Sequence, residues 1–388
     1  APGDSWGDTD KFDWAMMSVF GRVVYSWKDR YTFTGSLRGD GSSRFGKDNR
    51  WGIFPSVALG WNLSNEEFWT NHIGENFGAK LRVSWGISGN NNIGNYEHVG
   101  YMSNLGGYVL GGQIVPTRYP SAFVDNLLGW EKTDQYNVGM DLSFLRNRLT
   151  LSANYYNSIS NDLLFNKPIS AIAGATQYKS NLSNAKIRNT GFDIQVDGRI
   201  LTGPVTWNVG ANLSLNRNKV LSLPDSQSIV SIGERSAISH ITMVGKPIGS
   251  FYGLNSLGVI SEEEYQRILV DKQHIGEEGY QLTGPAVWNY ENVQPGDAKW
   301  KDVNNDGKIT DDDREILGDN YPDFTYGFST NISYKGVSLS ASFSGVQGAQ
   351  VISFQNYYLL NMEGTCNQFA LAADRYNSVT NPDPAMYR

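Results

Sequence analysis

The residues best suited to chemistry lie in one short segment of the chain, between positions 302 and 313. Its first, third, fifth and twelfth positions carry oxygen-bearing side chains, namely Asp302, Asn304, Asp306 and Asp313. Gly307 stands at the sixth position, where a calcium loop of the EF-hand or dockerin kind needs a sharp turn, and the seventh residue of such a loop offers its backbone carbonyl. We therefore predict a structural calcium site whose ligands are Asp302, Asn304, Asp306, Lys308 and Asp313. The alternative is an acidic turn that binds no ion.

Two neighbouring patterns concern local structure more than chemistry. The acidic run from Asp311 to Glu315 predicts a short helix start, since acidic residues favour the positive end of a helix. Ser261 followed by Glu264 predicts a second, capped helix start in a solvated loop. Aromatic residues of the predicted loops could stack on sugar rings, although we expect most to pack the loops together: Trp6, Trp69, Trp130, Trp288, Tyr290 and Trp300.

The sequence gives little support for catalysis, and we predict that the protein is not an enzyme. The single Cys366 excludes an internal disulfide and a cysteine-based zinc site. Neither a Gly-x-Ser-x-Gly nor a His-Glu-x-x-His motif occurs. The histidines are scattered without metal-ligand spacing, at His72, His98, His240 and His274.

The elements that must position these residues are β-strands, because apolar and small polar residues alternate through much of the chain. Between Val205 and Asn216 every odd position is apolar and every even position is Gly, Ser, Thr or Asn. The same pattern predicts ten strands, at 18–27, 31–38, 55–62, 79–87, 133–144, 149–158, 184–199, 205–216, 324–334 and 337–345.

The composition of the two strand faces favours a membrane β-barrel over a soluble β-sandwich. The polar face is mostly small and neutral, as in a water-filled barrel interior, and charged residues make up only 18% of the chain. The sequence contains no run of 18 apolar residues, so it predicts no membrane-spanning helix. A net charge of −7 offers no basic field for nucleic acid. Aromatic residues near strand ends suit lipid–water interfaces: Tyr25, Trp27, Tyr31, Tyr155, Tyr156, Trp207 and Tyr334.

Short and long connections alternate between the predicted strands, which is typical of outer-membrane barrels. The long connections are 39–54, 88–132, 159–183 and 217–323. The connection 63–78 has an intermediate length and occurs where the alternation requires a short one. The first strand begins and the tenth ends on the side of the long loops. We therefore expect an internal section of a larger barrel, with further strands pairing at both edges.

Several segments within this pattern form a set of recognisable motifs. The first set comprises Asp40–Gly46, Asn49–Ser56 and Leu59–Trp61. Further segments follow: Leu81–Gly86, Gly89–Asn91, Trp130–Thr133, Asn189–Phe192, Gly245–Gly253 and Pro295–Asp297. The first set resembles the hallmark segment of the SusC/RagA family of TonB-linked outer-membrane transporters, and the further segments match that family in its order.

The resemblance implies an all-β fold, an antiparallel transmembrane β-barrel of which this chain is a section. Residues 1–388 would belong to one plugged barrel domain of about 22 strands, and 217–323 would be a long extracellular loop region containing the calcium-type loop 302–313. No plug domain, TonB-contacting box or closing strand is visible in the sequence.

The resemblance also implies a place and a function. The expected location is the outer membrane of a Gram-negative, Bacteroidota-type bacterium, in contact with membrane lipid. The expected function is import of oligosaccharides or peptides, with a SusD-like surface lipoprotein as partner and the TonB complex as the source of energy. The alternative functions are a soluble or surface-attached β-rich glycan-binding protein with a calcium-stiffened loop, and an outer-membrane barrel enzyme.

Overall fold

The computed structural model describes residues 11–74, 76–100, 102–120, 123–170, 172, 177–224, 228–232, 239–277, 279–360, 367–377 and 379–381. The chain divides into two compact units, which are described separately below. The first comprises Ala1–Ser228, Met243–Ile248 and Tyr321–Gly348, and the second comprises Ile229–Thr242, Gly249–Asn320 and Ala349–Arg388. Among the described residues, no helix has the length and apolar character needed to cross a membrane.

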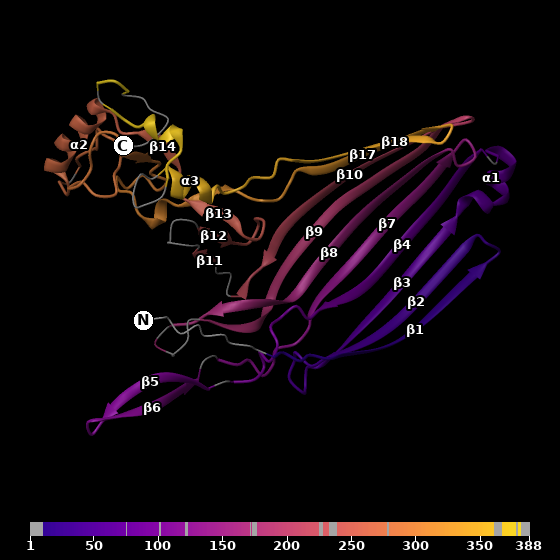
Figure 1. Ribbon diagram of the computed structural model, residues 1–388, viewed down its shortest axis with the longest axis horizontal. Helices are drawn as coiled ribbons and strands as arrows, with labels where there is room; N and C mark the ends of the chain where they lie inside the picture. The colour runs from indigo at the N-terminus through magenta and orange to yellow at the C-terminus, as the bar shows by residue number, and fades with distance from the viewer. Residues whose placement is uncertain are drawn as a thin grey trace. The chain divides into compact units, whose positions relative to one another are not determined.

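The first unit is built on one ten-stranded antiparallel sheet (Figure 1), so the predicted strands are confirmed. The strands follow one another in chain order across the sheet, interrupted only by insertions after β4 and β10. They are β1 (Met16–Trp27), β2 (Tyr31–Ser42), β3 (Trp51–Asn62), β4 (Phe77–Asn90), β7 (Glu131–Phe144), β8 (Leu149–Pro168), β9 (Gln177–Thr202), β10 (Val205–Ser222), β17 (Phe324–Tyr334) and β18 (Val337–Gln347).

The short connections lie together at one end of the sheet, the end that carries helix α1 (Glu67–His72) in Figure 1. Lys335 and Gly336 join β17 to β18 with φ angles of 47° and 86°. A two-residue hairpin favours such positive φ values because the resulting turn matches the twist of the paired strands. The connection between β3 and β4 contains a 3-10 turn (Leu63–Asn65) and α1, which confirms its place among the connections at this end.

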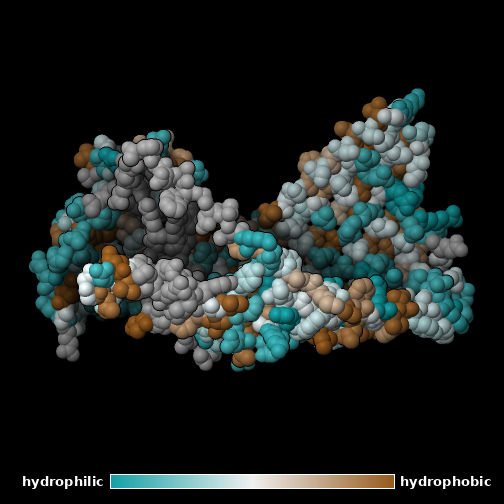
Figure 2. Space-filling model, turned by 60° about the horizontal axis from the view of Figure 1, so that its bottom comes forward, coloured by the Kyte–Doolittle hydropathy of each residue, from teal (hydrophilic) through white to brown (hydrophobic). Residues whose placement is uncertain are grey.

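The strand register places the apolar residues of neighbouring strands on one continuous face. Val209 of β10 is opposite Thr330 of β17 and Gly198 of β9, whereas Asn212 is opposite Gly327 and Gln195. Val209 and Asn212 therefore lie on different faces of the sheet, as the alternation predicts. Figure 2 shows apolar side chains at the molecular surface of the sheet.

Aromatic rings collect on the apolar face beside the short connections. Trp27, Tyr31 and Trp61 stack in a row, with ring centroids 5.7 and 6.2 Å apart. Such a row suits a lipid–water interface, where aromatic rings prefer to lie. Tyr156 is an exception to the predicted belt, because its hydroxyl donates to the Asn216 side chain at 3.1 Å on the polar face. The alternation explains this error, since the adjacent residue Tyr155 occupies the apolar face.

Several strands run further than a membrane requires. β8 has 20 residues and β9 has 26, whereas a tilted strand crosses a bilayer in about 9–11. The excess lies at the end of the long connections, so the prediction ended these strands too early there. The β8–β9 hairpin thus continues beyond the expected membrane zone.

The ten strands do not close on themselves. Among the described residues, β1 pairs with β2 and β18 pairs with β17, and each of these two outer strands has a single neighbour. The predicted open section of a barrel is therefore confirmed.

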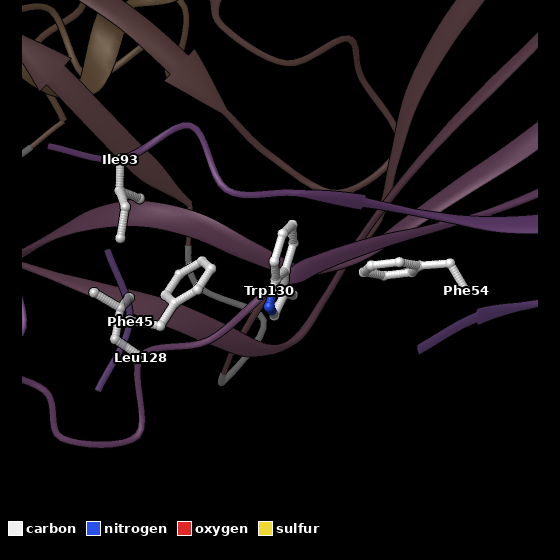
Figure 3. Packing of buried hydrophobic residues seen from close by; sticks show 5 residues of the cluster. All are labelled: Phe45, Phe54, Ile93, Leu128 and Trp130. Carbon is white, nitrogen blue, oxygen red and sulfur yellow. The ribbon is translucent and has the colours of Figure 1, made fainter. Parts of the chain in front are cut away.

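A compact hydrophobic core joins the long connections of the first unit (Figure 3). Trp130 lies between Phe45 and Phe54, with ring centroids 5.3 Å from each, and its indole nitrogen donates to the Arg50 carbonyl at 3.0 Å. Gly89 packs against the Phe54 ring so closely that any Cβ there would lie 2.1 Å from it. Part of the family hallmark therefore serves to hold the loops together.

Apart from the helix start at Ser261, the sequence did not predict the shorter elements inside the long connections. A hairpin of β5 (Met102–Leu110) and β6 (Gln113–Pro120) follows β4. The second unit contains the helices α2 (Glu262–His274) and α3 (Phe354–Leu359), and two small sheets whose strands have three or four residues each. These strands are β11 (Ile229–Ile232), β12 (Ser239–Thr242), β13 (Ser250–Gly253) and β16 (Glu315–Gly318), and then β14 (Ser256–Val259) and β15 (Ala298–Trp300).

Candidate functional site

The calcium-type loop folds around hydrogen bonds from its own backbone amides. Asp302 Oδ2 accepts from the Gly307 amide at 2.8 Å, and Gly307 has a φ of +80° that a side chain would strain. Asn304 Oδ1 accepts from the Asp306 amide at 2.9 Å, and Asp306 Oδ1 accepts from the Lys308 amide at 2.8 Å. The predicted ligand residues thus lie on one tight loop.

Asp313, the twelfth residue, closes this loop from within. Its buried carboxylate accepts from the backbone amides of Thr310 at 2.7 Å and Val303 at 2.9 Å. The bond from Thr310 and then the bond from Val303 hold the pKa of Asp313 below its usual value, against the opposing effect of burial. The predicted helix start is confirmed only as one 3-10 turn (Asp311–Asp313), and Glu315 instead begins β16.

The loop also contains an unsatisfied oxygen. Asp302 Oδ1 is buried and has no hydrogen-bond partner in the described part of the chain. A buried carboxylate oxygen without a partner is costly, and a cation would relieve that cost. The described residues hold no group of three or more His, Cys, Asp or Glu side chains arranged around one point. A hard cation here would therefore depend on Asn304 and backbone carbonyl oxygen as well as on carboxylates.

The loop is attached to the segment that precedes it. Val287 and Lys308 form an isolated parallel bridge, in which the Ile309 amide donates to the Val287 carbonyl at 3.2 Å. Tyr290 donates its hydroxyl to the Gly307 carbonyl at 3.0 Å. Residues 287–290 are thus held at both ends by the calcium-type loop.

A second buried carboxylate, Asp271 of α2, organises the residues that follow the helix. It is 1% exposed and accepts from the Tyr280 hydroxyl at 2.8 Å, the Thr283 amide at 3.0 Å and the Gly284 amide at 2.7 Å. Burial alone would raise the pKa of Asp271, but these donors outweigh it and lower the pKa. Nothing in the sequence marks Asp271 for this role, since it lies in an ordinary helical pattern. At the start of the same helix, the predicted cap is confirmed, because Ser261 and Glu264 form a reciprocal capping box.

The loop aromatics differ in what they do, and the expectation that they pack the loops is confirmed for Trp69, Trp130 and Tyr290. Trp130 lies in the core of the first unit, and Trp69 stacks on Phe77 at 5.2 Å. Tyr290 packs against the buried cluster of Ile260, Ile268 and Val287. Trp288 is the exception, with 58% of its surface exposed. Trp6 lies outside the described residues.

The polar face of the sheet carries a charged network that the sequence analysis missed. Arg82 of β4 binds both carboxylate oxygens of Asp141 of β7, at 2.7 and 2.8 Å, and donates to Asn154 of β8 at 2.9 Å. Gly139 leaves room for this arrangement, since a Cβ there would lie 3.0 Å from the guanidinium. This network could be found only from the strand order, because β4 pairs with β7 across the β5–β6 insertion.

The histidines are engaged separately in local contacts. His98 interacts with the Arg44 carbonyl and His274 with Glu277, at 2.9 and 3.0 Å. His72 interacts with the Phe68 carbonyl, and the His240 ring packs edge-on against Phe251.

Comparison with known proteins connects this fold to one family. Residues 1–239 match the family model described as TonB dependent receptor-like, beta-barrel. The chain is 32% identical to TonB-dependent receptor P3 of Formosa agariphila, over 92% of this chain and 34% of that protein. It is also 32% identical to TonB-dependent receptor SusC of Bacteroides thetaiotaomicron, over 84% of this chain and 30% of SusC. The chain therefore spans about a third of the length of these relatives.

Solved structures of the RagAB peptide transporter have the same fold. One of them gives a TM-score of 0.75 at 24% identity and covers 97% of this chain and 38% of that chain. A structure of the RagAB peptide importer in its open-open state gives a TM-score of 0.69 at 25% identity, over 90% of this chain and 34% of the other.

The family match and the apolar face of the sheet agree on the outer membrane as the location of the protein. The family model covers more than half of the chain and includes eight of the ten strands of the large sheet, β1 to β10 without the β5–β6 hairpin. The chain therefore belongs to the TonB-dependent receptor-like β-barrel family, and its resemblance to SusC/RagA transporters is confirmed.

Proposed function

We propose that this chain is part of a SusC-like transporter that imports oligosaccharides or peptides across the outer membrane. The observation that carries the proposal is the ten-stranded sheet with an exposed apolar face and a polar opposite face, in a chain of this family. Such a sheet lines an aqueous lumen once further strands complete the barrel. Energy would come from the TonB complex through parts of the protein outside this sequence.

A soluble glycan-binding protein explains the structure less well. A soluble sheet covers its apolar face with other protein elements, whereas here Val337, Leu339 and Phe343 of β18 are 74%, 70% and 62% exposed. No catalytic role is proposed.

Uptake measurements test the proposal directly. A strain that lacks the gene is expected to lose TonB-dependent uptake of either labelled oligosaccharides or labelled peptides, and the full-length gene should restore it. Unchanged uptake of both classes would contradict import by this protein.

Cysteine labelling tests the orientation of the sheet in the full-length protein. With Cys366→Ser as the background, Val209→Cys should react with lipid-phase reagents and Asn212→Cys with aqueous reagents. Equal aqueous reactivity at both positions would contradict the barrel.

We also propose a SusD-like surface lipoprotein as partner, following the SusC/RagA resemblance. The full-length protein solubilised in mild detergent should retain such a lipoprotein during purification. Its absence from purified material, and equal uptake in a strain lacking neighbouring lipoprotein genes, would contradict the partnership.

For the loop 302–313 we propose a structural calcium ion held by Asp302, Asn304, Asp306, Asp313 and the Lys308 carbonyl. The buried, unpartnered Asp302 Oδ1 supports this proposal, because it needs a positive partner. The ion would neutralise the loop and stiffen it. Chelation of calcium should increase proteolysis between 287 and 315 in the wild type and have no effect in Asp302→Ala/Asp306→Ala, while unchanged proteolysis in the wild type would contradict the site.

A further inference from the structure

The second unit contains a hollow with two tryptophans and several polar side chains on its walls. Its volume is about 260 Å³, and its lining includes Trp288, Trp300, Asn289, Asn292 and Asp297, with Val287 as part of its apolar floor. We propose that this hollow is a binding subsite for one ring of a neutral oligosaccharide. The inference deepens the proposed import function and rests on it, because it names the class of substrate.

Trp288 is placed for contact with a ligand. Its neighbours Val287 and Tyr290 are fixed by the bridge to Lys308 and by the hydrogen bond to Gly307, which hold the backbone on both sides of it. Its own side chain nevertheless remains 58% exposed. When a ligand covers an exposed apolar ring whose backbone is already held in place, the burial of apolar surface lowers the free energy of the complex.

Backbone hydrogen bonds hold another part of the hollow. The Ile260 amide donates to the Asp297 carbonyl at 2.9 Å, and the Gly296 amide donates to the Ile260 carbonyl at 2.8 Å. These bonds join the start of α2 to the turn that precedes β15, which carries Trp300. A site formed before the ligand arrives loses little conformational entropy on binding.

The chemistry of the lining favours a sugar. A pyranose ring presents C–H groups on its faces and hydroxyl groups around its edge. Indole rings pack against the faces, while the amides of Asn289 and Asn292 can both donate to and accept from hydroxyls. Within the described lining no lysine, arginine or histidine is present. The single carboxylate of the lining, Asp297, accepts from the Gln294 amide at 2.8 Å. The lining therefore offers no cation to a peptide carboxylate, which favours a neutral ligand.

A second hollow extends the same surface, which favours an oligosaccharide over a single sugar. Its volume is about 470 Å³, and Trp288 and Trp300 line it together with Phe251, Tyr252 and Arg314. Because both tryptophans border both hollows, successive rings of one chain could contact them.

Binding to the full-length protein in detergent tests the inference. Isothermal titration would use four hexasaccharide probes: maltohexaose, cellohexaose, laminarihexaose and mannohexaose. At least one should bind the wild type, and Trp288→Ala should weaken its binding about tenfold or more. Trp288→Phe, which keeps a flat ring, should lose much less. Val270→Ala is the matched control, because Val270 is apolar, half-exposed and located in the same unit on α2.

Two results would overturn the inference. One is an absence of binding for all four hexasaccharides, and the other is equal affinity of Trp288→Ala and the wild type. Both are distinguishable from failure of the proposed import function, which is measured by uptake in the deletion strain. Import restored equally by wild type and Trp288→Ala would leave the transport function intact and remove this subsite.

Discussion

The large sheet and the region from Gly249 to Asn320 are stabilised in different ways. In the sheet, continuous backbone ladders pair ten strands, and the apolar residues face outward. In the second region the strands have only three or four residues, and buried carboxylates accept from backbone amides of the turns between them. No single side chain therefore sets the backbone pairing of the sheet, whereas one carboxylate can determine the conformation of the loop region.

The largest loss of stability is expected when a charge is placed on the apolar face of the sheet. Val209→Arg would place a charge on the apolar face and should destabilise the folded barrel by about 2–4 kcal/mol if it lies near the bilayer midplane. Asn208→Arg, on the opposite face, should cost far less. Denaturant titration of the full-length protein in phospholipid vesicles measures both, and equal losses would show that the two faces do not differ.

In the loop region the largest effect is expected at Asp271. Asp271→Ala would leave the Thr283 and Gly284 amides without their acceptor and should cost about 1–3 kcal/mol locally. Hydrogen exchange should increase across 262–284, with no change in the strands of the sheet. Glu277→Ala, a change at an exposed residue nearby, serves as the control. Increased exchange throughout the sheet would show that the two regions unfold together.

Low pH should destabilise the loop region but not the sheet, without any mutation. The pKa values of Asp271 and Glu315 are lowered in the folded state, Glu315 chiefly through its bond with Lys301. Their stabilising contribution is therefore complete above the unfolded pKa of about 4 and is lost as the pH falls through the lower folded values. Proteolysis in the loop region should increase below about pH 4 while the sheet remains protected. Asp271→Asn should be less sensitive to this change.

A smaller effect is expected at the start of α2. Ser261→Ala removes the side chain that accepts from the Glu264 amide at 3.2 Å and should cost about 1 kcal/mol. Exchange of the first amides of the helix reports this loss. Gln266→Ala, on the exposed surface of the same helix, should leave those amides unchanged, and an equal effect of both changes would contradict the capping role.

The smallest effect is expected for an exposed ion pair. Lys272 and Glu291 approach to 2.7 Å, but the Glu291 side chain is largely exposed. Glu291→Ala should therefore change the stability of the loop region by less than about 1 kcal/mol. A loss as large as that of Asp271→Ala would show that surface pairs, and not buried carboxylates, stabilise this region.

The same contrast explains which features could be predicted from the sequence. All ten strands of the sheet were predicted because alternation is imposed directly by their two different environments. The short strands β11 to β16 were not, because three or four residues are too few to show a period. The calcium-type loop was predicted in position, since its spacing is local. Asp271 and the Arg82–Asp141 pair were missed, because their partners are nine or more residues away and nothing local marks them.

The pairing of β10 with β17 has a consequence for assembly. Ser214 is opposite Thr325, so the chain leaves the sheet after β10 and returns beside the same strand. The entropy lost in closing a loop rises only slowly with its length, by about 0.6 kcal/mol for each doubling. Residues 223–323 can therefore lengthen, shorten or be exchanged at small cost to strand pairing. The region inserted between β10 and β17 can thus change in length and sequence while the sheet that carries it keeps its pairing.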